Sequence, residues 1–288
     1  MNIKKQLLIL ERRIARKVSL SWLEYVSYRI TTGRTLHLKH PRYLDEKLMW
    51  INHYDNNPLK SVCADKYRVH EYLKKKGLDQ YTVPLLAQYE HPEDINYAEL
   101  PNAFVLKCNH GCGFNIFVKN KTDIDTSAIG DTLTNWLSIC YGGGLERHYS
   151  LIQPCIIAES YLEELSQDLV DYKLLCFNGN PNHFYVCRRG NEEHHCMMSS
   201  YSLQWDNLGY CKSEDPIRIP KPLNLSKMID IARIIAKDFL FVRVDFYEVN
   251  GTLYIGELTF TPQQNTMYWY NQRANVLLGE QLKLPFEK

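Results

Sequence analysis

The chain has 288 residues, 45% of them hydrophobic, and a formal net charge of +1 at pH 7. This length and composition suffice for one large or two smaller globular domains with buried cores, and the near-neutral charge gives no reason to expect a nucleic-acid partner. The nine cysteines are odd in number and contain no Cys-x-x-Cys pair, so we expect reduced thiols in a cytoplasmic protein rather than a disulfide framework. No apolar run is long enough for a secretory signal or a membrane span.

Residues 1–30 carry an amphipathic helical pattern. Seven basic residues against two acidic ones accompany an apolar stripe of Ile3, Leu7, Leu10, Ile14, Val18, Trp22 and Tyr25. The stripe predicts a helix packed on its own domain with a solvated basic face. Peripheral contact with an anionic membrane surface or an acidic partner is the alternative.

Beyond residue 30, predicted strands and helices follow one another without strict β-α-β repetition. Helices are predicted over residues 65–76 (ended by Gly77), 132–140 and 225–240, and strands or hairpins over 103–108, 116–120, 154–162, 171–189 and 241–262. A glycine-containing turn, "NHGCGFN", separates the first two strands. This order favours an α+β fold over a doubly wound sheet.

The last hairpin, "FVRVDFYEVNGTLYIGELTFTP", is the most strand-like stretch, yet it contains Arg243, Asp245 and Glu257. Alternate residues of a strand share a face, so Arg243 and Asp245 lie together, opposite a core-facing set of valines and Phe246. Whether Glu257 joins them depends on the turn.

Two turns are compatible with the Asn-Gly sequence. A two-residue turn would put Asp245 and Glu257 on opposite faces. A three-residue loop over residues 249–251 would pair Glu248 with Thr252, placing the arginine opposite the glutamate and the aspartate on the diagonal. We predict the three-residue loop.

Two adjacent carboxylates repel unless a cation lies between them. Mg²⁺ takes one or two carboxylates together with substrate phosphates, and Arg243 suits a developing anion. The alternative is a cross-strand Arg–Glu pair on a solvated sheet face.

Other polar residues stand where strands and helices end. Lys107 ends a strand before the glycine turn, whose backbone N–H groups could bind phosphate, although the spacing is not that of a Walker loop. Lys66 opens the predicted helix 65–76, where an anion would also meet the helix N-terminus. Glu159 closes a strand and could hold an adenine; it could equally be a turn residue.

In this order the motifs "DK", "FVLKCNHGCGFN", "IIAESYL", "DYKLLCFNG", "VRVD" and "GELTFTP" resemble those of the ATP-grasp superfamily. The chain is most similar to the TupA-like ATP-grasp amidoligases found with bacterial surface-polysaccharide genes, from about residue 35 to "LLGEQLKLP". The resemblance implies two α+β lobes, about 61–160 and 161–288, with ATP between them, preceded by an N-terminal helical segment, 1–60.

The resemblance also implies roles for individual residues. Lys107 and Arg243 would act in catalysis. ATP would be bound by Lys66, Lys107, Gly111, Gly113, Glu159, Tyr161, Leu162, Asp171 and Lys173. Mg²⁺ would be bound by Asp245 and Glu257. Many relatives carry Asn two residues after the metal glutamate, where this chain has Thr259; a hydroxyl, a water or Asn265 could fill that position.

The implied activity is ATP-dependent amide formation through an acyl-phosphate, joining an amino acid or amino alcohol to a uronic acid of a capsular or other surface polysaccharide. Arg188 and Arg189 could meet the substrate carboxylate, or be solvated; Glu146, Arg147 and Tyr149 could border the acceptor site. The rival hypotheses are a glycosyltransferase, for which no Asp-x-Asp motif is present, and a non-catalytic scaffold.

Overall fold

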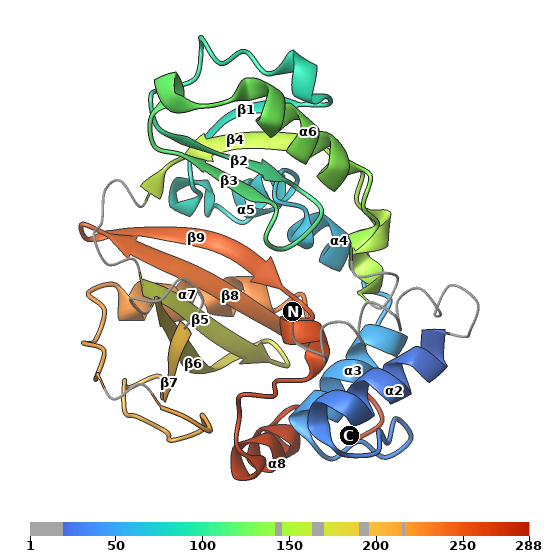
Figure 1. Cartoon of the computed structure of the whole chain (residues 1–288). Helices are drawn as coiled ribbons and strands as arrows, with labels where there is room; N and C mark the ends of the chain where they lie inside the picture. The colour runs from blue at the N-terminus through green and yellow to red at the C-terminus, as the bar shows by residue number, and fades with distance from the viewer. Residues whose placement is uncertain (1–19, 142–145, 163–169, 190–195, 215–216, 288) are drawn as a thin grey trace.

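The computed structural model describes residues 20–141, 146–162, 170–189, 196–214 and 217–287. Two antiparallel sheets and their covering helices make an α+β fold (Figure 1). The helices are α2 (Leu20–Thr32), α3 (Leu44–Tyr54), α4 (Leu59–Ala64), α5 (Val69–Lys75), α6 (Thr126–Leu137), α7 (Leu225–Ala236) and α8 (Gln272–Gln281). None of these helices is both long enough and apolar enough to span a membrane.

The first sheet has the strand order β1-β4-β2-β3, with all neighbours antiparallel. Its strands are β1 (Leu85–Tyr89), β2 (Phe104–Cys108), β3 (Asn115–Val118) and β4 (Ile156–Ser160). Helix α6 covers one face, where Ile129 and Leu133 pack on Phe104, Leu106 and Ile156. This helix begins before the predicted residue 132, because the carboxylate of Asp125 caps the N–H groups of the first turn.

The second sheet has the order β7-β6-β5-β8-β9. Its strands are β5 (Val170–Phe177), β6 (Asn180–Arg189), β7 (Cys196–Tyr201), β8 (Phe241–Val249) and β9 (Thr252–Thr259). Helix α7 buries one face through Met228 and Ile235 against Val242 and Val244. Helices α3 and α8 cover part of the other face, where they pack on Leu175 and Phe241 (Figure 1).

The covered face of the second sheet changes character along its strands. Phe241 and Leu175 belong to the apolar cluster, whereas Arg243, Asp245 and Lys173 continue the same face on β8 and β5. The charged residues therefore lie beyond the part of this face on which α3 and α8 pack.

Two predictions about helices need correction. The predicted helix 65–76 begins only at residue 69, as α5, and a separate helix that was not predicted, α4, precedes it. Between them Asp65 accepts hydrogen bonds from the N–H groups of Tyr67 and Arg68 and turns the chain. Gly77 follows α5 with φ +70°, as predicted for a helix stop. On α2 the predicted apolar stripe is displaced, since Trp22 and Tyr25 are exposed while Leu23 and Tyr28 are buried. The stripe's first five residues lie outside the described residues.

Candidate functional site

The hairpin of β8 and β9 turns at Asn250 and Gly251, both with positive φ, and Val249 pairs with Thr252. The prediction of a three-residue loop is therefore wrong: this is a two-residue turn of the kind that favours Asn-Gly. By itself it would separate Asp245 from Glu257.

A β-bulge farther along the hairpin reverses that consequence. Phe246 pairs with Ile255, but Asp245 pairs with Glu257, so Gly256 is the extra residue. Asp245 therefore lies directly opposite Glu257, and Arg243 lies opposite Thr259 rather than opposite Glu257 as predicted. The predicted convergence of the charged side chains on one face is confirmed, through a different register.

Gly256 also permits a close contact across the hairpin. A Cβ at this position would lie 2.4 Å from Cε2 of Tyr247, closer than side chains approach one another. A glycine inside a strand signals a bulge or a close backbone approach, so the sequence contained this information.

The guanidinium of Arg243 organises the cluster. Its Nε and Nη2 donate to the two oxygens of Asp245, both at 2.6 Å. Nη2 also donates to Glu257 Oε1 at 2.8 Å and to Thr259 Oγ1 at 2.9 Å, and Nη1 donates to the hydroxyl of Tyr185 at 2.9 Å. The rigid donor fork of arginine thus fixes the position of both carboxylates.

Lys173 supplies a second cation from β5. Its Nζ lies 2.7 Å from Asp245 Oδ2 and 3.5 Å from Asp171 Oδ2. Burial disfavours the charged ammonium, but the attraction of Asp245 outweighs it and raises the pKa of Lys173 well above its usual value. Lys173 is therefore a permanent cation beside Asp245.

The cluster is buried, which argues against the alternative of a solvated cross-strand pair. Arg243 is 7% exposed and Asp245 is 1% exposed. Burial alone would raise the pKa of Glu257, but Arg243, Lys173 and Lys66 together lower it to about 2. Charges held this way in a partly dehydrated site are typical of functional sites.

Lys66 and Lys107 approach from the first sheet's side. Lys66 lies in the turn between α4 and α5, not at the start of a helix as predicted, and its Nζ donates to the carbonyl of Gly111. Lys107 forms an ion pair with Glu159 across β2 and β4. In the glycine turn, Gly113 has φ +80°, and a Cβ on Gly111 would clash with the rings of Tyr141 and Phe114. The first glycine allows close packing and the second allows the turn.

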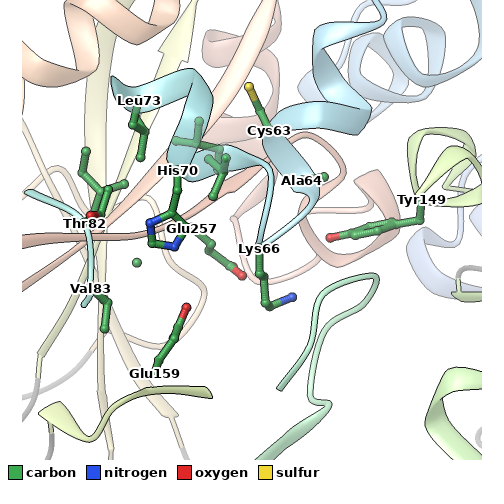
Figure 2. Close-up of a pocket in the computed structure, with 14 residues that line it drawn as sticks. Cys63, Ala64, Lys66, His70, Leu73, Thr82, Val83, Tyr149, Glu159 and Glu257 are labelled. Atoms are coloured by element: carbon green, nitrogen blue, oxygen red, sulfur yellow. The ribbon is translucent and has the colours of Figure 1, made fainter. Parts of the chain in front are cut away.

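These elements line a narrow pocket between the two sheets, with a cavity volume of about 20 Å³ (Figure 2). Of the residues assigned by resemblance, Lys66, Glu159 and Glu257 line it. The other lining residues are Cys63, Ala64, Val69, His70, Leu73, Thr82, Val83, Tyr149, Ile255, Gly256 and Leu258. Its lining combines apolar walls with a few charged groups, which is the usual composition of small-molecule sites.

Among the residues not assigned from sequence, His70 and Thr82 line this pocket. Figure 2 shows the ring of His70 to the left of the Glu257 side chain, with the Glu159 side chain below both. His70 follows Lys66 by four residues, a helical spacing that could have suggested a common face. Thr82 forms a parallel bridge with Ile255, which ties the loop before β1 to β9.

Several other predicted residues lie apart from this pocket. Tyr161 packs with Ala103 and Val105, and Leu162 packs with Val83 and Val249. The backbone of Arg188 pairs with Val170 and Met197 and that of Arg189 with Cys196, but their side chains lie outside the described residues.

Asn265 lines a different, smaller pocket with Glu24 and Met49. Thr259, in contrast, contacts both Arg243 and Glu257 and stands beside the carboxylate pair. Of the two candidates for the third ligand position, Thr259 is the one next to the carboxylates.

The donor set suits Mg²⁺ only in part. Within the described ranges, no three His, Cys, Asp or Glu side chains converge on one point. Asp245 and Glu257 stand opposite each other, and Mg²⁺ commonly uses one or two carboxylates and completes its octahedron with phosphate oxygens and water. The pair fits a magnesium ion that arrives with a phosphate ligand.

Known structures share parts of this chain's architecture. D-alanine–D-alanine ligase from Bacillus anthracis, complexed with ATP, is 16% identical with a TM-score of 0.45, covering 76% of this chain and 64% of its own. L-amino acid ligase from Bacillus licheniformis is 12% identical with a TM-score of 0.44, covering 72% and 42%. D-alanine–D-alanine ligase from Helicobacter pylori is 14% identical with a TM-score of 0.45, covering 77% and 62%. The chain thus spans less than two thirds of the length of each.

A comparison with curated proteins found no significant match. The model of the TupA-like ATP-grasp family, in contrast, matches residues 46–283, which include both sheets and every residue of the charged cluster. The chain therefore belongs to the TupA-like ATP-grasp family and has the ATP-grasp fold.

Proposed function

We propose that this protein is an ATP-dependent carboxylate–amine ligase that forms an amide through an acyl-phosphate. The observation that carries the proposal is the cluster of buried Arg243 and Asp245 with half-buried Glu257, beside a pocket that also contains Lys66 and Glu159. Membership of the family and the ligase titles of the similar structures agree with it.

The proposed cofactors are ATP and Mg²⁺. Lys66, Lys107 and the glycine turn would bind phosphates, and Asp245 and Glu257 would hold the metal, which neutralises phosphate charge when bound. Lys66 now contacts the Gly111 carbonyl and Lys107 contacts Glu159, so a phosphate would replace both contacts. Glu159, Tyr161 and the Leu162 backbone would bind the adenine, Asp171 the ribose, and Lys173 would lie near the nucleotide.

Such a site needs positioned charges more than a protein nucleophile. In the proposed reaction a carboxylate oxygen attacks the γ-phosphorus and ADP leaves, with Arg243 neutralising charge on the transferred group. An amine then attacks the acyl carbon, inorganic phosphate leaves, and the amide remains. Residues 61–160 and 161–288 would form the two lobes that hold the nucleotide.

The proposed substrates are a uronic acid of a capsular or other surface polysaccharide, or its activated precursor, and an amino acid or amino alcohol. The proposed location is the cytoplasm. Peripheral membrane contact through the basic N-terminal segment, residues 1–30, is the alternative to packing of this segment on its own domain. The chain's resemblance to amidoligases found with bacterial surface-polysaccharide genes supports this choice of substrates.

The experiment that tests the function measures nucleotide products with purified protein, Mg²⁺, ATP, uronic acids and a panel of amines. ADP and phosphate release that requires both substrates supports the ligase. Release of UDP from a sugar nucleotide would establish a glycosyltransferase instead, and no nucleotide binding would favour a scaffold.

Glu257→Gln sharpens this test. The amide keeps the size of the side chain but removes its charge, so we expect normal folding and a loss of Mg²⁺-dependent turnover by orders of magnitude. Glu280→Gln, on the exposed surface of α8, is the matched control and should retain full turnover. Turnover of Glu257→Gln near that of the wild type would remove Glu257 from the metal site.

A further inference from the structure

A second pocket adjoins the first and is built on the same three elements. Its cavity volume is about 160 Å³. Ser61 of α4, His148 of η5 (Arg147–Leu151) and Phe260 after β9 line it, while Tyr149 of η5 and Leu258 of β9 line the first pocket. A ligand in the second pocket would therefore lie beside the candidate phosphoryl-transfer site.

One polar group in this pocket lacks a protein partner. His148 is 7% exposed, and its Nε2 has no hydrogen-bond partner within the described part of the chain. Burial lowers the pKa of His148 to about 3, so the imidazole is neutral at neutral pH. A neutral imidazole pairs with hydroxyl groups as donor or acceptor, and buried polar groups are normally paired. The position suits a hydroxyl-bearing ligand.

The two cations that line the pocket differ in availability. Lys60 Nζ is held by the carboxylate and the carbonyl of Asp55, each at 2.8 Å. Arg147 contacts the His53 carbonyl through Nη1 at 3.4 Å and His53 Nδ1 through Nη2 at 3.0 Å. Guanidinium carries five N–H donors, so Arg147 can also bind an anion.

The remaining lining combines apolar and amide groups. Ile51 and Phe260 are buried apolar walls, and Leu151 is 71% exposed at the rim. Asn56 is exposed on the same rim. The flat ring of Phe260 beside hydroxyl-binding groups matches a sugar ring, which presents C–H faces and hydroxyl edges.

We infer that the second pocket binds an anionic sugar as the acceptor of the reaction. His148 and Ser61 bind ring hydroxyls, and Arg147 binds the anionic group, which is either a carboxylate or a phosphate on the sugar. The inference rests on the proposed function, because only a ligase or another transferase needs an acceptor beside the nucleotide. It goes further by assigning the pocket that holds the acceptor and the residues that select it.

Saturation-transfer NMR and titration on the full chain test this without nucleotide. The probes are D-glucuronate, D-glucose 1-phosphate, D-glucose and acetate. We expect one or both anionic sugars to bind, and D-glucose and acetate to bind at least ten-fold more weakly. Arg147→Met should weaken anionic-sugar binding at least ten-fold, whereas the matched variant Arg273→Met, on the exposed surface of α8, should not change it.

His148→Phe separates recognition from structure. Because Nε2 has no protein partner, Phe should not lower the melting temperature, yet it should weaken sugar binding at least ten-fold. A lower melting temperature with unchanged sugar binding would show a structural role and overturn the inference. Ser61→Phe, which fills the pocket, should abolish binding; if that variant does not fold, Arg147→Met and His148→Phe still decide.

The two proposals fail in different ways. Lys66→Met should lose MgATP binding and keep sugar binding. Absence of MgATP binding in the wild type would sink the ligase proposal even if sugars bind. Two results with MgATP binding intact would refute the acceptor pocket alone. One is that neither anionic sugar binds to the wild type. The other is that Arg147→Met and His148→Phe both bind the sugars as tightly as the wild type does.

Discussion

Replacing Gly256 by alanine tests whether the bulge in β9 aligns the carboxylates. The new Cβ would lie 2.4 Å from Cε2 of Tyr247 and 3.1 Å from two other ring atoms, whereas ordinary contacts are 3.4–4 Å. Tyr247 packs against the cluster of Val83, Leu162 and Val249, so its ring cannot simply swing away. The hairpin must shift by about 1 Å, the difference between these distances, and overpacking of this kind costs about 1–3 kcal/mol.

The shift should affect binding as well as stability. Gly256 is the residue that places Asp245 opposite Glu257, so moving the bulge displaces one carboxylate from the other. We expect Gly256→Ala to weaken MgATP binding at least ten-fold. Urea denaturation and nucleotide titration measure the two effects on the same sample.

Gly130→Ala is the matched control for Gly256→Ala. Gly130 lies inside α6, where a Cβ would come no closer than 3.9 Å to Pro92, so alanine should raise the free energy of unfolding by about 0.5–1 kcal/mol. Combining Gly256→Ala with Tyr247→Leu should recover part of the lost stability, because it removes the clashing ring. A Gly256→Ala protein as stable as the wild type, with unchanged MgATP affinity, would refute this account of the register.

Three further predictions concern buried charge. Asp45→Ala should lower the free energy of unfolding by about 3–5 kcal/mol, because the buried carboxylate binds Arg34, the Tyr28 hydroxyl and Asn275. The control Asp230→Ala, at an exposed ion pair, should lower it by less than about 0.5 kcal/mol. Similar losses of stability in the two variants would show that burial of Asp45 does not matter. Tyr185→Phe should lower the free energy of unfolding by about 1–3 kcal/mol and also lower turnover, because Arg243 Nη1 loses its hydrogen-bond acceptor. An unchanged melting temperature in calorimetry would mean that the other contacts of the guanidinium hold it without Tyr185. The pKa of Glu257 falls from 4.5 in the unfolded chain to about 2 in the folded protein, so between these pH values the unfolded chain binds the proton more tightly. The contribution of Glu257 to stability is therefore present above pH 4.5 and is lost as the pH falls towards 2. Glu257→Gln should flatten that part of the stability curve, and an unchanged slope would show that other groups cause it.

The sequence by itself determined the hairpins, two of the longer helices and the chemistry that these elements carry. Alternation in the hairpins, the Asn-Gly turns and Gly77 after its helix follow from local backbone preferences, which depend on neighbouring residues alone. The order of the motifs led to the resemblance to the TupA-like ATP-grasp family, and the match of that family's model to residues 46–283 confirmed the family. Arg243 and Asp245 could be placed on one face because a strand alternates strictly.

The tertiary structure decided what depends on distant contacts. The turn at Asn250 alone would have separated Asp245 from Glu257, and only the bulge at Gly256, fitted against the Tyr247 ring, brought them together. Tyr149, which the sequence analysis placed at the border of the acceptor site, lines the first pocket, and His148 lines the second, because η5 packs against α4 and α4 packs against β9. Such contacts join residues far apart in the chain, so no local pattern of the sequence records them.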